Sequence, residues 1–180
     1  LALPAAVYGW QGNVDLVLAW YRTVTDTTAP NLLVAENVSL VTMWAKWIGV
    51  GPLAARLGII TTLTALAGGA WATSRRARVS GPAYLEFGLL MLLVPLISPQ
   101  GWDYVLLLAT PAVICLVDRF GEVSMPWRLT TAAALGFMSF TIYDVVGRVL
   151  YSRLMAINII SVCALVLFVC LVRLRARAAA

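Results

Sequence analysis

Histidine is absent from this sequence of 180 residues, and charged residues make up only 12% of it. The lack of histidine excludes a histidine-based metal site and a histidine general base. The shortage of charge leaves too few polar groups to cover a water-facing surface, because 62% of the residues are hydrophobic and the mean hydropathy is +0.90. The composition therefore indicates a membrane protein, and the net charge of +5 is a topology signal rather than evidence for nucleic-acid binding.

The three cysteines follow no pattern typical of a disulfide or a metal site. Cys115, Cys163 and Cys170 each lie inside an apolar run, where a small apolar packing role is the simpler interpretation. We expect neither a metal ion nor a cofactor in this chain.

The start of the chain also lacks the features of a signal peptide. It has no initiator methionine, no charged segment before the first apolar run and no small-residue cleavage site. Residues 1–8 instead have the composition of the tail of a helix that begins earlier. We therefore expect residues 1–180 to form a single transmembrane domain that is the C-terminal part of a longer protein.

Apolar stretches predict an all-α fold, a polytopic bundle of transmembrane helices. A helix needs about 20 mainly apolar residues to cross a bilayer, and five stretches approach that length. They are residues 53–73, 83–97, 104–117, 129–143 and 154–172. Residues 9–52 are more mixed and rich in tryptophan and tyrosine, which favours amphipathic helices in a loop at the outer membrane surface.

Basic residues predict the orientation of the bundle, because lysine and arginine accumulate in short cytoplasmic loops. If successive spans run in opposite directions, the basic residues fall into two groups on opposite sides of the membrane. The larger group is Arg75, Arg76, Arg78, Arg119, Arg128, Arg173, Arg175 and Arg177, and the smaller is Arg22, Lys46, Arg56, Arg148 and Arg153. We therefore expect a cytoplasmic C-terminus, with residues 9–52 and 98–103 together on the outer face of the membrane.

Two polar clusters share that outer face, at residues 36–40 and 98–104. Asp103 could act as a general base or could cap the helix that follows it. Trp102 could support a sugar ring or could be an interfacial anchor. Lys46 and Arg56 could hold a phosphate, or could be ordinary cations whose charged ends reach the membrane surface.

Both clusters carry motifs that resemble glycosyltransferase family 87, which includes bacterial polyprenyl-phosphate-mannose-dependent mannosyltransferases. The segment 36–40 (Glu-Asn-Val-Ser-Leu) resembles the Asn-x-Ser-Leu element of that family. Residues 93–104 (Leu-Val-Pro-Leu-Ile-Ser-Pro-Gln-Gly-Trp-Asp-Tyr) resemble its Leu-x-Ser-Pro-x-x-Trp-x-His element. The family commonly has a histidine where this chain has Tyr104, and a tyrosine with its ordinary pKa near 10 is a poor proton shuttle at neutral pH.

The resemblance implies a C-type glycosyltransferase fold that moves a sugar from a polyprenyl-phosphate donor to an extracytoplasmic glycolipid or glycan acceptor. It also implies a donor site lined by Asn37, Ser39, Lys46, Arg56, Trp102, Asp103 and Tyr104. The principal catalytic carboxylate of such enzymes lies upstream of this sequence, so Asp103 is a secondary catalytic candidate and the isolated chain is expected to be inactive. A membrane transporter, a lipid flippase and a structural membrane subunit are the alternative functions.

Overall fold

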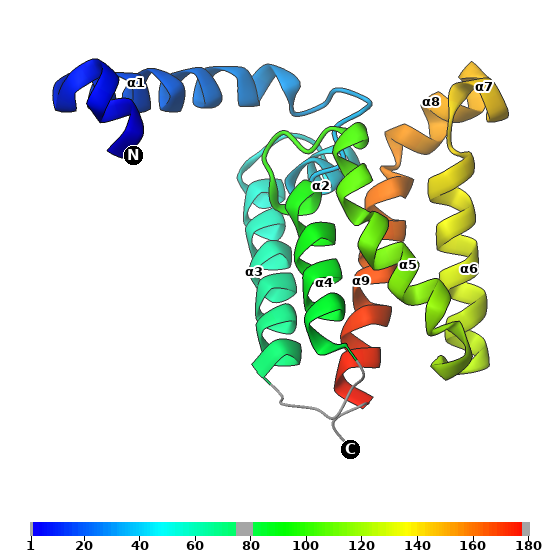
Figure 1. The fold of residues 1–180 in the computed structure, drawn as a ribbon. Helices are drawn as coiled ribbons and strands as arrows, with labels where there is room; N and C mark the ends of the chain where they lie inside the picture. The colour runs from blue at the N-terminus through cyan, green and yellow to red at the C-terminus, as the bar shows by residue number, and fades with distance from the viewer. Residues whose placement is uncertain (1, 75–80, 178–180) are drawn as a thin grey trace.

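The computed structural model describes residues 2–74 and 81–177, which are all-helical and contain no strand. The predicted all-α fold is therefore confirmed. The body of the molecule is a bundle in which five segments run side by side (Figure 1). These segments are α3 (Pro52–Ser74), α4 (Pro82–Ile97), η1 (Asp103–Ala109) continued by α5 (Thr110–Asp118), α6 (Met125–Phe140) and α9 (Ile159–Arg177).

Helix α9 is the centre of the bundle, because α3, α4, α5 and α6 all pack against it. Helix α4 contributes a stripe of buried leucines at Leu85, Leu89, Leu92 and Leu96, which the spacing of three or four residues places on one face. Helix α5 lies close against α4 because Gly88 has no side chain, and a Cβ there would come within 3.1 Å of the Ala112 Cα. The core therefore joins α9 to its neighbours through aliphatic side chains and close backbone contact.

The bundle has two unlike ends. The motif end carries α1 (Ala2–Asn31), α2 (Leu40–Ile48), the 98–103 turn, α7 (Tyr143–Val146) and α8 (Arg148–Ala156) (Figure 1). The opposite end carries the end of α5, the start of α6 and the end of α9, with Arg119, Arg128, Arg173 and Arg175. The arginines at 75, 76 and 78, on which the predicted orientation also depends, lie outside the described residues.

Two described helices are long and apolar enough to cross a membrane: α3, and residues 159–176 of α9. Helix α4 is apolar but has 16 residues, and α6 also has 16. The stretch predicted as a span at 104–117 is divided between the 3₁₀ helix η1 and the α-helix α5. Length and composition therefore give weaker support for a membrane bundle than the five spans expected from the sequence.

Helix α1 runs at a steep angle to the bundle and projects sideways past α3 at the motif end (Figure 1). Gly9 divides it, since its φ of 72° and ψ of 169° are not helical and suit a residue without Cβ. Residues 9–52 were predicted as an outer loop with amphipathic surface helices, and in the structure they form one helix through Asn31, a turn, and α2. No other described helix packs along α1.

Polar groups at the opposite end are used within the fold. Arg175 is 2% exposed, and its Nη2 lies 2.8 Å from Glu86 Oε1, so the two residues form an ion pair. The Arg173 guanidinium lies 4.7 Å from the centroid of the Trp127 ring. The three cysteines are free thiols and are buried, in agreement with the packing role that the sequence indicates.

Candidate functional site

Residues 36–40 and 98–104 pair directly at the motif end, and we call this pairing the motif junction. Asn37 and Trp102 form an isolated antiparallel bridge. The Val38 N–H donates to the Gly101 carbonyl at 2.6 Å, and the Asp103 N–H donates to the Glu36 carbonyl at 2.9 Å. The two clusters that the sequence assigns to one face are therefore joined to each other by their main chains.

Gly101 allows this pairing to form beside the end of α4. A Cβ at Gly101 would lie 2.0 Å from the carbonyl oxygen of Pro95 and 3.3 Å from the nitrogen of Ser39. Neither neighbour can move away independently, because both belong to the backbone. Only a residue without a side chain fits at this position of the motif.

Asn37 and Ser39 hold the junction together from inside the protein. Asn37 is 2% exposed, its Oδ1 accepts from the Ser39 N–H at 3.1 Å, and its Nδ2 donates to the carbonyls of Asn31 and Pro99. Ser39 is 1% exposed and is the N-cap of α2, where its Oγ accepts from the Thr42 N–H at 3.2 Å. These two predicted substrate-binding side chains thus have their polar atoms engaged within the chain.

Lys46 is half-buried below the same loop and also bonds to the protein. Its Nζ donates to the carbonyls of Ala35 at 2.9 Å, Asn37 at 3.2 Å and Met155 at 3.1 Å. Burial lowers the pKa of Lys46 from 10.5 to about 8, although the charge of Glu36 acts to raise it. All three donors of the ammonium group are used, so Lys46 fixes the loop to α8 in this conformation.

The turn between α8 and α9 supports the junction from the other side, and the sequence-based predictions missed it. The Ser161 Oγ donates to the Val38 carbonyl at 2.6 Å, and the Trp47 Nε1 donates to the Ile157 carbonyl at 2.8 Å. Asn158 is buried with a left-handed φ of 53°, a conformation that asparagine adopts more readily than most residues. The signal was present, because Asn158 and Ser161 interrupt the apolar stretch predicted as the fifth span.

Beside the junction is a cleft of about 570 Å³ between the η1–α5 segment and α6. Asp103 and Tyr104 line its mouth at the motif end. Thr110, Ser139 and Thr141 add hydroxyl groups to its wall. The rest of the lining is mainly aliphatic, from Leu106, Leu107, Ala109, Val113, Leu135, Met138, Ile142 and Ile160. The cleft therefore combines a polar mouth with an apolar interior.

Asp103 and Tyr104 are the predicted site residues that line this cleft, and Trp102 lies beside them through its contact with Tyr104. The rings of Trp102 and Tyr104 are stacked, with centroids 6.4 Å apart and planes inclined by 12°. Tyr104 is 65% exposed, and Trp102 and Asp103 are half-buried. Two parallel aromatic faces and a carboxylate are thus available to a ligand.

Asp103 has an unusual electrostatic setting for a carboxylate on the surface of a helix bundle. Burial raises its pKa from 3.8, the Tyr104 N–H at 2.7 Å from Oδ1 opposes this, and the charge of Glu36 raises the pKa further. Burial and the charges of Asp103 and Glu36 also raise the pKa of Tyr151 on α8. Glu36 and Tyr151 therefore belong to the same electrostatic cluster, although the site prediction included neither.

The helix-capping alternative for Asp103 is met only in part. Trp102, not Asp103, is the N-cap of η1, and the carboxylate accepts from the next residue alone among its described main-chain partners. Arg56 is exposed on α3 and does not line the cleft, so the structure does not bring it to Asp103. Within residues 2–74 and 81–177, no cluster of three or more metal-ligating side chains occurs.

The fold and the junction define an all-helical protein with a half-buried carboxylate at the mouth of an apolar cleft. Comparisons with protein-family models, with curated proteins and with solved structures returned no match. The family resemblance carried by the two motifs therefore stays a prediction.

Proposed function

We propose that the bundle crosses a lipid bilayer with five segments, namely α3, α4, the η1–α5 segment after Asp103, α6 and α9. Helix α3 supports this, because only 22% of its apolar stretch is buried and Ile59, Ile60 and Leu63 are each more than half exposed. Phe87 and Leu90 on α4 and Leu129 and Phe140 on α6 are similarly exposed. Water penalises such a surface, whereas hydrocarbon does not.

The shorter segments need local adjustment of the bilayer. A helix of 16 residues, such as α4 or α6, rises about 24 Å at 1.5 Å per residue, less than the ~30 Å of a typical hydrocarbon core. Thinning of the bilayer and the turns at each end can make up the difference at a modest cost. In this arrangement the motif end is extracytoplasmic and the C-terminus is cytoplasmic.

We infer that the protein functions as a membrane glycosyltransferase. The resemblance of its motifs favours a mannosyltransferase. The observation that carries this inference is the motif junction, which brings two segments with family-like motifs together beside the cleft. The apolar interior of the cleft suits the hydrocarbon of a polyprenyl-phosphate donor, and its polar mouth suits the sugar and phosphate. The stacked rings of Trp102 and Tyr104 offer a face for the apolar side of a sugar.

In this proposal the acceptor hydroxyl attacks the anomeric carbon, a new glycosidic bond forms, and the bond to the lipid phosphate breaks. A carboxylate must orient the hydroxyl and take its proton. Asp103 can assist this carboxylate from the cleft mouth, because a carboxylate with a raised pKa accepts a proton more readily than an ordinary one. The family resemblance implies that the principal carboxylate of such an enzyme lies outside residues 1–180.

The proposal is tested by mannosyl transfer in membranes that contain the full-length gene product, with radiolabelled polyprenyl-phosphate mannose as donor. Asp103→Asn and Trp102→Ala are compared with Asp144→Asn, an exposed acid on α7 at the same end of the bundle. A general base contributes about 10²–10⁴-fold, so Asp103→Asn should lower transfer by at least about 10-fold if Asp103 assists such a base. The control should leave transfer unchanged.

Absence of transfer by the wild-type protein would contradict the proposal, as would equal transfer by all three variants at equal protein levels. Movement of labelled lipid across the vesicle membrane without transfer would instead favour a flippase. Loss of a partner complex on deletion, with transfer untouched, would favour a structural subunit.

A further inference from the structure

Helix α1 presents two unlike faces along its length after Gly9. Trp10, Val14, Val17, Tyr21 and Val24 follow one another at intervals of four and three residues, which places them in a single stripe. The opposite stripe has the same spacing and consists of Asp15, Ala19, Arg22 and Asp26, all of them exposed. The helix is therefore amphipathic in the arrangement of its side chains.

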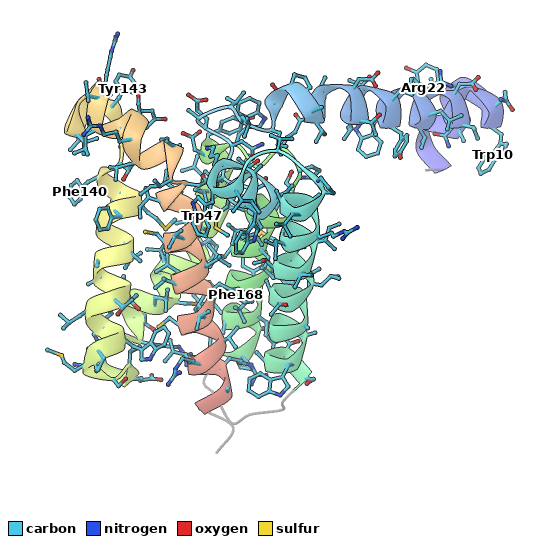
Figure 2. All side chains as sticks on the ribbon, turned by 180° about the vertical axis from the view of Figure 1, so that it is seen from behind. Trp10, Arg22, Trp47, Phe140, Tyr143 and Phe168 are labelled. Atoms are coloured by element: carbon cyan, nitrogen blue, oxygen red, sulfur yellow. The ribbon has the colours of Figure 1, made fainter. Side chains whose placement is uncertain are left out.

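The apolar face of α1 points toward the side on which the bundle lies. Figure 2 shows Trp10 on that side of the helix and Arg22 on the other side. No described helix covers the apolar stripe, since Trp10 is 72%, Val17 43% and Tyr21 60% exposed. The stripe is thus turned toward the same side of the motif end as the exposed apolar side chains of α3 and α4.

The C-terminal turn of α1 fixes its direction by bonds to both halves of the motif junction. The Gln100 Nε2 donates to the Thr27 Oγ1 at 2.8 Å and to the Thr28 Oγ1 at 3.4 Å. The Asn37 Nδ2 donates to the Asn31 carbonyl at 3.1 Å. These contacts attach the C-terminal end of α1 to the motif end, from which the helix projects to one side of the bundle (Figure 1).

We propose that α1 is a bilayer-binding helix that lies in the plane of the membrane, with its apolar stripe in the lipid and Asp15, Arg22 and Asp26 in water. The stripe contacts the interfacial region of the lipid leaflet on the side of the motif end. Interfacial helices take this orientation, and tryptophan and tyrosine are enriched at that depth. This inference rests on the proposed membrane position of the bundle.

The charge of α1 indicates which lipids it binds. Its described charged residues are two aspartates and one arginine, a net charge of −1, so anionic headgroups do not attract it. Insertion of the aromatic and aliphatic stripe is then the dominant contribution, and it requires no acidic lipid. Binding should persist in a zwitterionic bilayer and should change little with salt.

Spin labels on the full-length protein in phosphatidylcholine nanodiscs test the inference. Val17→Cys places a label in the stripe, Ala19→Cys places one on the opposite face, and Leu63→Cys on α3 reports the position of the bundle. The three native cysteines are buried, which limits their reaction with the label. We expect oxygen to relax the Val17 and Leu63 labels strongly, and a water-soluble nickel chelate to relax the Ala19 label several-fold more than the Val17 label.

The outcomes separate this inference from the proposed function. A Leu63 label in lipid with both α1 labels in water overturns the inference alone. A Leu63 label in water overturns the membrane position of the bundle as well. Dipolar broadening between Val17 labels of two molecules, with no contact to lipid, would show that a second copy covers the stripe and would also overturn the inference. Release of the Val17 label from the bilayer by salt would contradict the predicted dominance of apolar insertion.

Discussion

The two halves of the motif junction are both polar segments at one end of the bundle, but they differ in what their side chains do. In the first half, Asn37 and Ser39 are almost fully buried and bond to the protein. In the second half, Tyr104 is exposed, and Asp103 stands at the mouth of a cleft. A motif can therefore combine residues that build a site with residues that present chemistry, and side-chain burial distinguishes them.

The largest expected effect comes from Gly101, where the two halves meet. Gly101→Ala places a Cβ 2.0 Å from the Pro95 carbonyl oxygen, and the backbone on both sides must shift to accept it. We expect a loss of stability of about 3 kcal/mol or more, the upper part of the range for overpacked interiors. Thermal unfolding can be followed by the reaction of the buried cysteines with a thiol-specific dye.

Gly136→Ala is the matched control for that change. Gly136 lies within α6, and no atom comes within 4 Å of an added Cβ. Alanine is favoured over glycine in a helix by about 1 kcal/mol, so this variant should be as stable as the wild type or more stable. Equal melting temperatures for the Gly101 and Gly136 variants would refute the close packing of the junction.

A smaller effect is expected where the halves differ most. Asn37→Ala removes the bonds to Ser39, Asn31 and Pro99 and should cost about 1–3 kcal/mol, because buried partners lose their hydrogen bonds. Tyr104→Phe removes an exposed hydroxyl and should change stability by less than about 0.5 kcal/mol. The same thiol assay compares the two variants, and a Tyr104 variant as unstable as the Asn37 variant would remove the distinction between the halves.

A pH-dependent effect is expected from the protonation of Lys46, which supports the first half. Its pKa is lowered from 10.5 to about 8 in the folded protein, so the unfolded chain holds more protons between these two values. The contribution of Lys46 to stability should therefore rise as the pH increases from about 8 to 10.5 and should be constant below that window. Lys46 is the only lysine, so amine labelling followed by mass spectrometry of its peptide measures the titration.

Replacement of Glu36 sharpens this measurement. The carboxylate of Glu36 raises the pKa of Lys46, so Glu36→Gln should move the labelling midpoint below that of the wild type. Asp144→Asn on α7 should leave the midpoint in place. A wild-type midpoint near 10.5 would show that Lys46 is not desolvated.

Hydropathy was sufficient to predict the helical fold because long apolar runs have few other stable conformations. The alternation of the five segments also agrees with the structure, which places residues 36–40 and 98–104 at one end. Local periodicity could not predict the α8–α9 turn, where Asn158 takes a left-handed conformation and Ser161 bonds to Val38. That contact spans 123 positions of the chain, and its polar partners are specified only by the tertiary fold.

The site prediction had the same limit. Residue type and membrane side grouped Asn37, Lys46 and Asp103 correctly at one end, but neither feature reveals which polar atoms the protein itself satisfies. The sequence left open whether Lys46 holds a phosphate or is an ordinary cation at the membrane surface, and in the structure three carbonyls surround its ammonium group. Its phosphate-binding role stays a prediction that would require those bonds to be exchanged for a ligand.

The main-chain bonds of the motif junction have a consequence for how such a protein can diverge. The bonds from Val38 to Gly101 and from Asp103 to Glu36 use backbone atoms, so they survive most changes of the side chains at 36, 38 and 103. Mutation can then alter the groups at the cleft mouth while the supporting architecture is inherited intact. Gly101 is the exception, and change of the side chains at the cleft mouth is compatible with this scaffold wherever that glycine is retained.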